Sequence, residues 1–577
     1  MNKNDVRNIL GRDGYKCTED GQIVNNKNSP VTNIIIIPKR QVRFIRNGMY
    51  EIYIVVSVVI DGDREVDDIK LSASEVSNLK WVPSYLGMDA IIYPGKEKDF
   101  LLIIKKLFRY VETIEQYSNT GWVKSGNGEY EYLDYDGAIG EETIDVEMDE
   151  HFRNYKISRK ESDVSLATQK SLDLLNVVDE GIAYILLGLV YLCPLLEFIG
   201  KILKLPEFVV WLYGFTGTRK TTIGKLFLSH FGSFENRVTA SFNDTYSSIE
   251  LKSYKLKDSL MILDDFCPQQ SHKETQNINT VAERIVRAYG DRTSRGRLTV
   301  TMESQTQFIP RGMTLITGES IVPGNSTVAR LLPIELKQDS VNLEALTEAQ
   351  RNTELLSISM RTYILWIKKE VNNNYEEFLE AIKANYYYYL NEIREKAIMT
   401  HGRTYESFAW LLVGLDMMYQ FYVEVGIITA EKADESIEHA KLEFLEHIKN
   451  KHENSKADDP VELFLETIKE LITSKSVTMK NLETGEVVGN QYKSIDGFYD
   501  SEYYYFNSNN IYGIVRSKLQ RAGVYLQLPI KGLLKALADR RVIKVEDKNN
   551  LPKKTIRNDD GSNSRPRMLH IKKEYLD

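Results

Sequence analysis

The feature that most constrains this chain is a glycine-rich turn between a predicted strand and a predicted helix. The strand is FVVWLY at 208–213, and GFTGTRKTT follows it directly. Glycines let backbone N–H groups close around phosphate oxygens, and the N-terminus of the new helix favours the same anions. The pattern predicts a phosphate-binding loop in a parallel α/β sheet. The predicted nucleotide-binding residues are Gly214, Thr216, Gly217, Thr218, Arg219, Lys220, Thr221 and Thr222.

Two side chains of this loop have predicted chemical roles. Lys220 is expected to reach the β and γ phosphates of ATP, and the Thr221 hydroxyl is expected to bind Mg²⁺. The glycine that usually precedes the lysine is replaced by Arg219. Arg219 must therefore adopt whatever backbone angles the loop requires. A strand–turn–helix with a chance lysine is the alternative interpretation.

A second apolar strand, LMIL, ends in the carboxylate pair Asp264 and Asp265. Asp264 is expected to hold Mg²⁺ directly or through water, and Asp265 to orient and deprotonate the attacking water. Related motors usually carry glutamate at the second place. The shorter aspartate requires the water to sit closer or the strand to shift. Two solvated aspartates are the alternative, but their position 43 residues after Thr221 favours the metal site.

A third strand is predicted at Met313–Thr317. In an AAA+ arrangement the polar residue at its end, Thr317, is sensor 1 and helps to place the water; an ordinary strand end is the alternative. Arg330 follows, just before another strand, where an arginine finger would enter a neighbouring subunit's site. A surface salt bridge is the alternative for Arg330. Arg403, at the start of a predicted helix, is a candidate sensor 2.

The pattern of elements predicts a multidomain α/β protein. Residues 1–155 are predicted as a β-rich N-terminal domain, 156–450 as an AAA+ P-loop core with a helical lid, and 451–577 as a winged-helix domain. The stretch 182–199 is almost long enough to span a bilayer. Because it contains Pro194 and Glu197 and has no basic anchors on its N-terminal side, we expect a buried helix against the parallel sheet and no membrane partner.

Basic residues are concentrated near the C-terminus. Between Ser508 and Lys573 there are 16 Lys and Arg against 5 Asp and Glu, although the whole chain carries a net charge of −8. This asymmetry indicates a domain that meets a polyanion. Two helices, a strand, a basic loop and a return strand follow the order of a winged helix, which binds duplex DNA. The alternative is a solvated helical tail with a protein partner. The predicted DNA contacts here are Lys531 and Lys535 on a helix and Lys553 and Lys554 in the wing.

A second candidate DNA contact lies between the carboxylate pair and the third strand. Arg292, Arg295 and Arg297 fall in a turn that could form a hairpin facing a central pore and grip a phosphate backbone. A solvated loop or an intersubunit salt bridge is an equally good interpretation.

Three cysteines, Cys17, Cys193 and Cys267, lie far apart in the sequence and form no CxxC pair. Neither a zinc knuckle nor a disulfide framework is expected. No apolar segment follows the polar residues at the start of the sequence, so we expect no signal peptide and a cytoplasmic location.

Taken in order, these motifs are similar to a known family. A β-rich N-terminal domain carrying Thr120-Gly121-Trp122 is followed by GFTGTRKTT, LDDF, LITGE, VARL and a basic winged helix. This order resembles the self-loading replication initiator helicases of staphylococcal mobile elements. Those include the pathogenicity-island Rep proteins, to which the resemblance looks closest, and the cassette-chromosome helicases. Those are distant relatives of minichromosome-maintenance and superfamily 3 helicases. The resemblance implies a hexameric ring that binds origin duplex DNA through its C-terminal domain and translocates on single-stranded DNA.

Two other classes of function stay open. A STAND-like signalling or defence ATPase would use the same loop to switch state without unwinding DNA. A DNA-binding regulator with a vestigial ATP site is supported only by Arg219. Stimulation of ATP hydrolysis by single-stranded DNA distinguishes a motor from the first class, and measurable turnover distinguishes it from the second.

Overall fold

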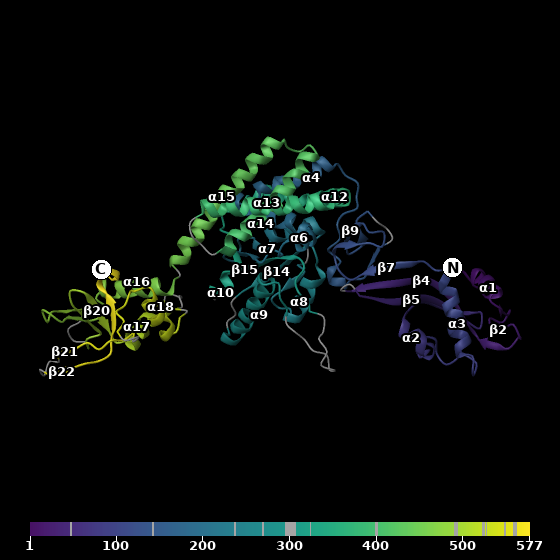
Figure 1. The fold of residues 1–577 in the computed structure, drawn as a ribbon, viewed down its shortest axis with the longest axis horizontal. Coiled ribbons are helices and arrows are strands. Elements are labelled where there is room, and N and C mark those ends of the chain that lie inside the picture. Colours follow the sequence, from purple (N-terminus) through teal and green to yellow (C-terminus); the bar gives the residue numbers. More distant parts are fainter. Residues whose placement is uncertain are drawn as a thin grey trace. The chain divides into compact units, whose positions relative to one another are not determined.

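The computed structural model divides the chain into two compact units (Figure 1). The first comprises Met1–Lys396 and His401–Phe444, and the second comprises Leu445–Asp577 with the short segment Ala397–Thr400. The structure describes all residues except 47–48, 141–143, 236–237, 268–270, 295–306, 323–324, 398–401, 458, 490–493, 522–525, 527, 547–549, 558–561 and 577.

The N-terminal part of the first unit is rich in β-structure. Its largest sheet has the strand order β11-β7-β4-β5-β6. Neighbours β4, β5 and β6 are antiparallel, whereas β7 pairs parallel to both β4 and β11. The strands are β4 Ile34–Arg46, β5 Met49–Ile60, β6 Arg64–Ser72, β7 Thr113–Tyr117 and β11 Ile144–Val146; a smaller sheet holds β1 Tyr15–Cys17, β2 Ile23–Asn25 and β3 Pro30–Thr32.

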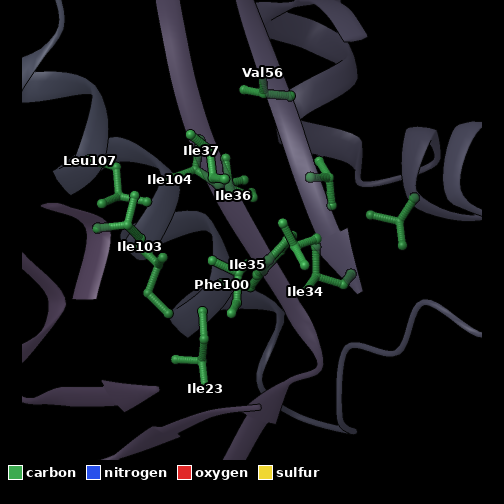
Figure 2. Close-up of a cluster of buried hydrophobic side chains, with 14 of the residues drawn as sticks. Ile23, Ile34, Ile35, Ile36, Ile37, Val56, Phe100, Ile103, Ile104 and Leu107 are labelled. Carbon is green, nitrogen blue, oxygen red and sulfur yellow. The ribbon is translucent and has the colours of Figure 1, made fainter. Parts of the chain in front are cut away.

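The unbroken isoleucine run of β4 forms the centre of this part's core. Ile34, Ile35, Ile36 and Ile37 are all buried, which requires both faces of the sheet to be covered at this end. Figure 2 shows these side chains beside Phe100, Ile103, Ile104 and Leu107 of α3 (Glu97–Leu107). Helices α1 (Lys3–Arg12) and α2 (Ala73–Asn78) add Val6, Leu10 and Val76 to the same cluster.

A small sheet with the order β10-β9-β8 joins the N-terminal part to the rest of the unit. Its strands are β8 Gly121–Lys124, β9 Tyr130–Asp134 and β10 Gly137–Ala138. The Trp122 backbone N–H donates to an Asp258 carboxylate oxygen at 2.9 Å, and the Trp122 indole donates to the Pro194 carbonyl at 2.7 Å. Gly121 has φ +90°, and a Cβ there would lie 2.5 Å from the Lys257 carbonyl oxygen. The Thr-Gly-Trp segment therefore packs against Lys257 and Asp258, directly before the strand that ends in the carboxylate pair.

The centre of the first unit is a wholly parallel sheet with the order β13-β14-β15-β12-β16. Its strands are β12 Val209–Tyr213, β13 Ala240–Ser241, β14 Leu260–Phe266, β15 Met313–Gly318 and β16 Leu331–Glu335. The three strands expected from apolar runs are present at their predicted places. Helix α7 (Lys220–Leu228) packs on β14 and β15, where a Cβ at Gly224 would lie 3.2 Å from Ile262.

Helices make up most of the remainder of the unit. Following β13 and β14 are α8 Tyr246–Lys255 and α9 His272–Gly290, and α10 Asn325–Val328 precedes β16. The later helices are α11 Leu343–Arg351, α12 Thr353–Asn373, α13 Tyr375–Lys396, α14 Gly402–Glu424 and α15 Ala430–Ala457; the earlier ones are α4 Val164–Leu172, α5 Glu180–Leu192 and α6 Leu196–Ile202.

Helix α5 contains the start of the apolar stretch 182–199, which is almost long enough to span a bilayer. Among the described residues one helical segment, Glu180–Ile202, is long and apolar enough to cross a bilayer, but 94% of its most apolar window is buried inside the protein. Its closest partner is α14 rather than the predicted parallel sheet. A Cβ at Gly414 would lie 2.3 Å from the Gly188 carbonyl oxygen. Glycine at this crossing lets the two backbones touch.

The second unit combines three helices with a mixed sheet around its own apolar core. The helices are α16 Pro460–Thr473, α17 Ser508–Arg521 and α18 Ile530–Asp539. The sheet order is β18-β17-β19-β20-β23, with β17 Met479–Asn481, β18 Val487–Val488, β19 Gly497–Tyr499, β20 Tyr503–Phe506 and β23 Leu569–Lys572; β21 Ile556–Arg557 pairs with β22 Asn563–Ser564. The strand expected between the second basic helix and the wing loop, at 542–545, is reduced to one isolated bridge between Ile543 and Ile571.

Candidate nucleotide site and its surroundings

The predicted phosphate loop connects β12 to α7 at the carboxyl edge of the parallel sheet. Gly214 and Gly217 have φ values of +155° and +93°. A Cβ at Gly214 would lie 2.3 Å from the Leu336 carbonyl oxygen, so only glycine fits there. Inside the loop, the Thr218 hydroxyl donates to the Phe215 carbonyl at 2.9 Å. The chain therefore forms the tight turn that the sequence predicts at this place.

Arg219 occupies the position where a glycine is usual, and it takes the backbone that a glycine would take. Its φ of 65° and ψ of 24° are left-handed, and it directly precedes the first residue of α7. For a residue with a Cβ this conformation costs about 1–2 kcal/mol. The side chain is exposed. The loop thus keeps its shape with arginine at this position, at the expense of local strain.

Lys220 lies folded over its own loop. Its ammonium group donates to the carbonyl oxygens of Gly214 and Phe215, both at 2.8 Å. Burial lowers the pKa of Lys220, while the carboxylates of Glu319 and Asp264 oppose that shift. A phosphate oxygen is a stronger partner for an ammonium group than a neutral carbonyl is. The lysine is thus held where an incoming phosphate can bind it.

Three oxygen-bearing side chains from three elements meet beside the loop. The Thr221 hydroxyl of α7 donates to Asp264 Oδ1 of β14 at 2.7 Å. The Thr317 hydroxyl of β15 donates to the same carboxylate oxygen. Hydroxyl and carboxylate oxygens are the ligands that Mg²⁺ prefers, so these residues fit the predicted metal. The structure brings together the side chains predicted at the loop, at the carboxylate pair and at sensor 1.

Asp265 is displaced from its neighbour by a bulge in β14. The pairing with β15 shifts between Leu263 and Phe266, and Asp265 has φ +68° with an exposed side chain. Its backbone N–H donates to the Thr317 hydroxyl at 3.3 Å. A bulge redirects a side chain at the edge of a sheet. This is the kind of strand shift that a short aspartate at this position was expected to need.

A third carboxylate, Glu319, belongs to the same edge and was not assigned a role from the sequence. It accepts hydrogen bonds from the Thr216 hydroxyl of the loop and, at 3.2 Å, from the Cys267 thiol. These two bonds lower the pKa of Glu319. The hydrogen bond to Glu319, together with burial, raises the pKa of Cys267 to about 11. Its position directly after β15, at the end of the LITGE run, is the sequence signal that could have identified Glu319 as a site residue.

Arg330 lies at the opposite edge of the sheet. Its carbonyl oxygen accepts from the Val209 N–H at the start of β12, so the length of β12, roughly 13 Å, separates it from the phosphate loop. Its Nε donates to Asp291 Oδ1 at 2.9 Å. Within one chain Arg330 therefore lies away from Lys220, at the opposite end of β12.

Arg403, the candidate sensor 2, lies beside Arg330. It donates to the Gly290 carbonyl at 2.9 Å and to Asp291 Oδ1 at 3.2 Å. The structure thus associates Arg403 with the amino edge of the sheet, whereas a sensor 2 acting in its own subunit would lie by the phosphate loop.

Of the three arginines predicted to form a DNA-gripping hairpin, only Arg292 falls among the described residues; Arg295 and Arg297 lie outside them. The Arg292 guanidinium donates to the carbonyl oxygens of Pro206, Pro310 and Gly312. Burial lowers its pKa to about 10. These contacts argue against the predicted DNA contact for Arg292 and favour a structural role, because its donors are already bonded inside the protein.

In the second unit, the predicted helix residues lie as expected. Lys531 and Lys535 of α18 are exposed, whereas Leu533 and Leu537 on the other side of the helix are buried. Leu534 is only partly buried against the core. One exposed basic stripe on α18 is therefore available to a partner.

The two predicted wing lysines differ from each other. Lys553 is exposed, but the Lys554 ammonium donates to Asp500 at 2.8 Å and to the Tyr505 hydroxyl at 2.7 Å. Burial raises the pKa of Asp500, but the hydrogen bonds that it accepts from Lys554 and from the Tyr505 hydroxyl outweigh burial and hold that pKa well below its usual range. The expectation that Lys554 contacts DNA is not supported, because its charge is compensated within the unit.

The fold is shared with one solved helicase over almost the whole chain. The structure titled "SCCmec type IV Cch - active helicase" matches with a TM-score of 0.60 and 12% identity, covering 97% of each chain. JCV helicase, solved with a bound small molecule, matches at 13% identity over 39% of this chain and 65% of its own, and its TM-score of 0.22 is too low to carry an argument. No family model and no curated protein matches the sequence.

Proposed function

We propose that this chain is an ATP-dependent DNA helicase of the AAA+ type that initiates replication of a mobile genetic element. One observation carries the proposal: the Thr221 and Thr317 hydroxyls both donate to the same carboxylate oxygen of Asp264, beside the loop that holds Lys220. The shared fold supports it, since the matching structure is described as "SCCmec type IV Cch - active helicase".

The carboxyl edge of the sheet would bind ATP and start its hydrolysis. The loop N–H groups and the Lys220 ammonium would bind the phosphates. Thr221 and Asp264 would hold Mg²⁺, which would supply positive charge to the phosphate oxygens. Asp265 would orient the attacking water and accept its proton, and Thr317, which bonds the Asp264 carboxylate and the Asp265 backbone N–H, would help to place that water. All of these roles belong to side chains and backbone groups at the carboxyl edge of the sheet.

The second half of the catalytic machinery would come from another copy of the chain. Arg330 cannot reach the phosphate loop of its own chain along β12, so a neighbouring subunit has to supply this charge to the transferring phosphoryl group. A closed ring, which we infer to be a hexamer from the family resemblance, gives every site such a neighbour. We place this assembly in the cytoplasm, with DNA and without a membrane partner.

The second unit would find the origin. Its three helices and the β21–β22 hairpin, which Lys553, Lys554, Arg565 and Arg567 flank in the sequence, follow the order expected of a winged helix. In that order α18 is the candidate for the major groove. The exposed Lys531 and Lys535 would meet base edges, and the exposed Lys553 would meet the phosphate backbone. Because Arg292 is bonded internally, the proposed contacts to single-stranded DNA fall to Arg295 and Arg297, which lie outside the described residues.

One pair of assays tests this function. ATP hydrolysis by the full chain should rise several-fold with single-stranded DNA, and a labelled forked duplex should be separated in the presence of ATP and Mg²⁺. Lys220→Ala protein is the control in both assays. Hydrolysis that no DNA changes, together with no strand separation, would favour the signalling ATPase, and no hydrolysis at all would favour a regulator with a vestigial site.

A further inference from the structure

The junction between α9, β16 and α14 holds two arginines on one carboxylate. Asp291 follows the last residue of α9, and its N–H donates to the Arg287 carbonyl, which closes the helix. Asp291 Oδ1 accepts from Arg330 Nε at 2.9 Å and from both terminal nitrogens of Arg403 at 3.2 Å. A single oxygen thus joins a residue at the start of β16 to a residue at the start of α14.

The stem of Arg330 is fixed as closely as its charged end. A Cβ at Gly290 would lie 2.7–2.8 Å from three side-chain carbons of Arg330, so that stem lies directly on the Gly290 backbone. The Gly290 carbonyl in turn accepts from Arg403 at 2.9 Å. Gly290 and Asp291 together restrain Arg330 at its carbons and at Nε, which sets the direction of its guanidinium plane.

The electrostatics of the junction favour the charged carboxylate. Burial raises the pKa of Asp291, but the bonds and charges of Arg330 and Arg403 outweigh burial and lower it. The side chains are about one-sixth exposed for Arg330 and one-third for Arg403, at 17% and 33%. Charge-assisted bonds in such a half-buried setting are stronger than those of a solvated pair.

We infer that Asp291 is a positioning residue that aims Arg330 at the nucleotide site of the next subunit, and that Arg403 of α14 braces Asp291. The inference rests on the proposed function, because it takes Arg330 to act in a neighbouring subunit. It goes beyond that function by linking α14 to Arg330: a displacement of α14 would shift Asp291 through Arg403 and thereby reorient Arg330. Asp291 itself touches no substrate.

The test uses full-length variants measured for ATP binding, kcat and KM. Asp291→Ala should lower kcat to within about tenfold of Arg330→Ala, while binding of a fluorescent ATP analogue stays near that of the unmodified protein. The double variant Asp291→Ala/Arg330→Ala should be no slower than Arg330→Ala, because a residue that acts through Arg330 has nothing left to position. Asp149→Asn, which breaks the Lys255 ion pair of similar exposure elsewhere in the unit, is the matched control and should keep normal kcat.

Mixing experiments separate positioning from general damage. Asp291→Ala mixed with Lys220→Ala should regain ATP hydrolysis, because some sites then combine an intact loop with an intact neighbouring Arg330. Gly290→Ala keeps the Asp291 carboxylate but displaces the Arg330 stem, so it should behave like Asp291→Ala, and it serves if Asp291→Ala fails to fold. Asp291→Glu should restore part of kcat.

The outcomes distinguish this inference from the proposed function. If Arg330→Ala regains activity on mixing but Asp291→Ala and Gly290→Ala do not, or if the double variant shows additive losses, Asp291 is not a positioning residue and the ring mechanism stands. If Asp291→Ala and Gly290→Ala both keep normal kcat while Arg330→Ala does not, the inference also fails alone. If Arg330→Ala itself hydrolyses ATP normally, both the neighbouring-subunit role of Arg330 and the role of Asp291 fall.

Discussion

The two edges of the parallel sheet carry opposite chemistry. At the carboxyl edge, hydroxyls and carboxylates gather around a single lysine, with Thr221 and Thr317 both bonded to Asp264. At the amino edge, two guanidinium groups gather around Asp291. The length of the strands separates the two groups within one chain. If Arg330 completes the nucleotide site, as the proposed function requires, this separation predicts that a second copy of the chain supplies it.

The largest effect is expected from breaking only the carboxyl edge. Lys220→Ala should abolish ATP hydrolysis, because Lys220 is the side chain expected to reach the β and γ phosphates. Duplex binding by the second unit should stay within about twofold of normal, since its exposed lysines lie in a separate compact unit. ATPase assays and fluorescence anisotropy with origin duplex measure the two activities. Equal loss of both would contradict the modular arrangement.

A substitution at the amino edge alone should give a loss of ATP hydrolysis that mixing with a second variant can partly restore. Arg330→Ala alone should reduce kcat by roughly three to five orders of magnitude, as loss of an arginine finger does. Mixed with Lys220→Ala it should recover part of the activity. Native mass spectrometry must first show that mixed rings form, and absence of recovery at every mixing ratio would then place Arg330 in its own subunit's chemistry or outside it.

A smaller loss is expected within the carboxyl edge itself. Asp265→Asn should bind ATP normally and hydrolyse it two to four orders of magnitude more slowly, because the amide cannot accept the proton of the attacking water. Single-turnover kinetics at saturating ATP isolate this step. Normal turnover in Asp265→Asn, combined with a loss in Asp264→Asn, would exchange the roles of the pair or point to Glu319 as the base.

The smallest effect concerns the basic residues that belong to neither edge. Lys553→Ala should weaken binding to all duplexes alike and reduce the salt slope by about one unit, whereas Lys535→Ala should relax sequence preference. Lys554→Ala should destabilise the second unit instead, because it leaves Asp500 without its ion-pair partner. Titrations of origin and scrambled duplexes at several salt concentrations, with thermal unfolding, separate these effects. A Lys554→Ala protein of normal stability and reduced salt slope would restore the original expectation.

Local patterns made the carboxyl edge predictable. Two glycines and a lysine within seven residues, directly after an apolar run, define the loop. An apolar run before two aspartates defines a second strand. The strands β13 and β17–β20 were missed because two to four residues give no measurable alternation. Even where the site was predicted, the left-handed Arg219 and the bulge at Asp265 depend on neighbouring strands and could not be deduced from spacing.

The amino edge and the inward-facing basic residues required tertiary structure. Asp291, Arg330 and Arg403 are far apart in the sequence, and nothing in the local pattern of Asp291 marks it as their common partner. In the same way, the sequence alone predicts that Arg292 and Lys554 are solvated cations. In the fold, Arg292 is bonded to the Pro206 carbonyl and Lys554 to the Asp500 carboxylate. Charge counting predicted a basic domain, but not which of its cations remain available.

The glycine-to-glycine crossing of α5 and α14 has a consequence for how the chain is made. The partner that covers α5 is encoded roughly two hundred residues later, so at about 5–20 residues per second the ribosome takes on the order of ten to forty seconds to supply it. During that interval the apolar segment Glu180–Ile202, which is long enough to cross a bilayer, lacks the packing that α14 supplies in the folded unit. Synthesis of this protein therefore depends on holding that segment away from bilayers and from other nascent chains until α14 emerges.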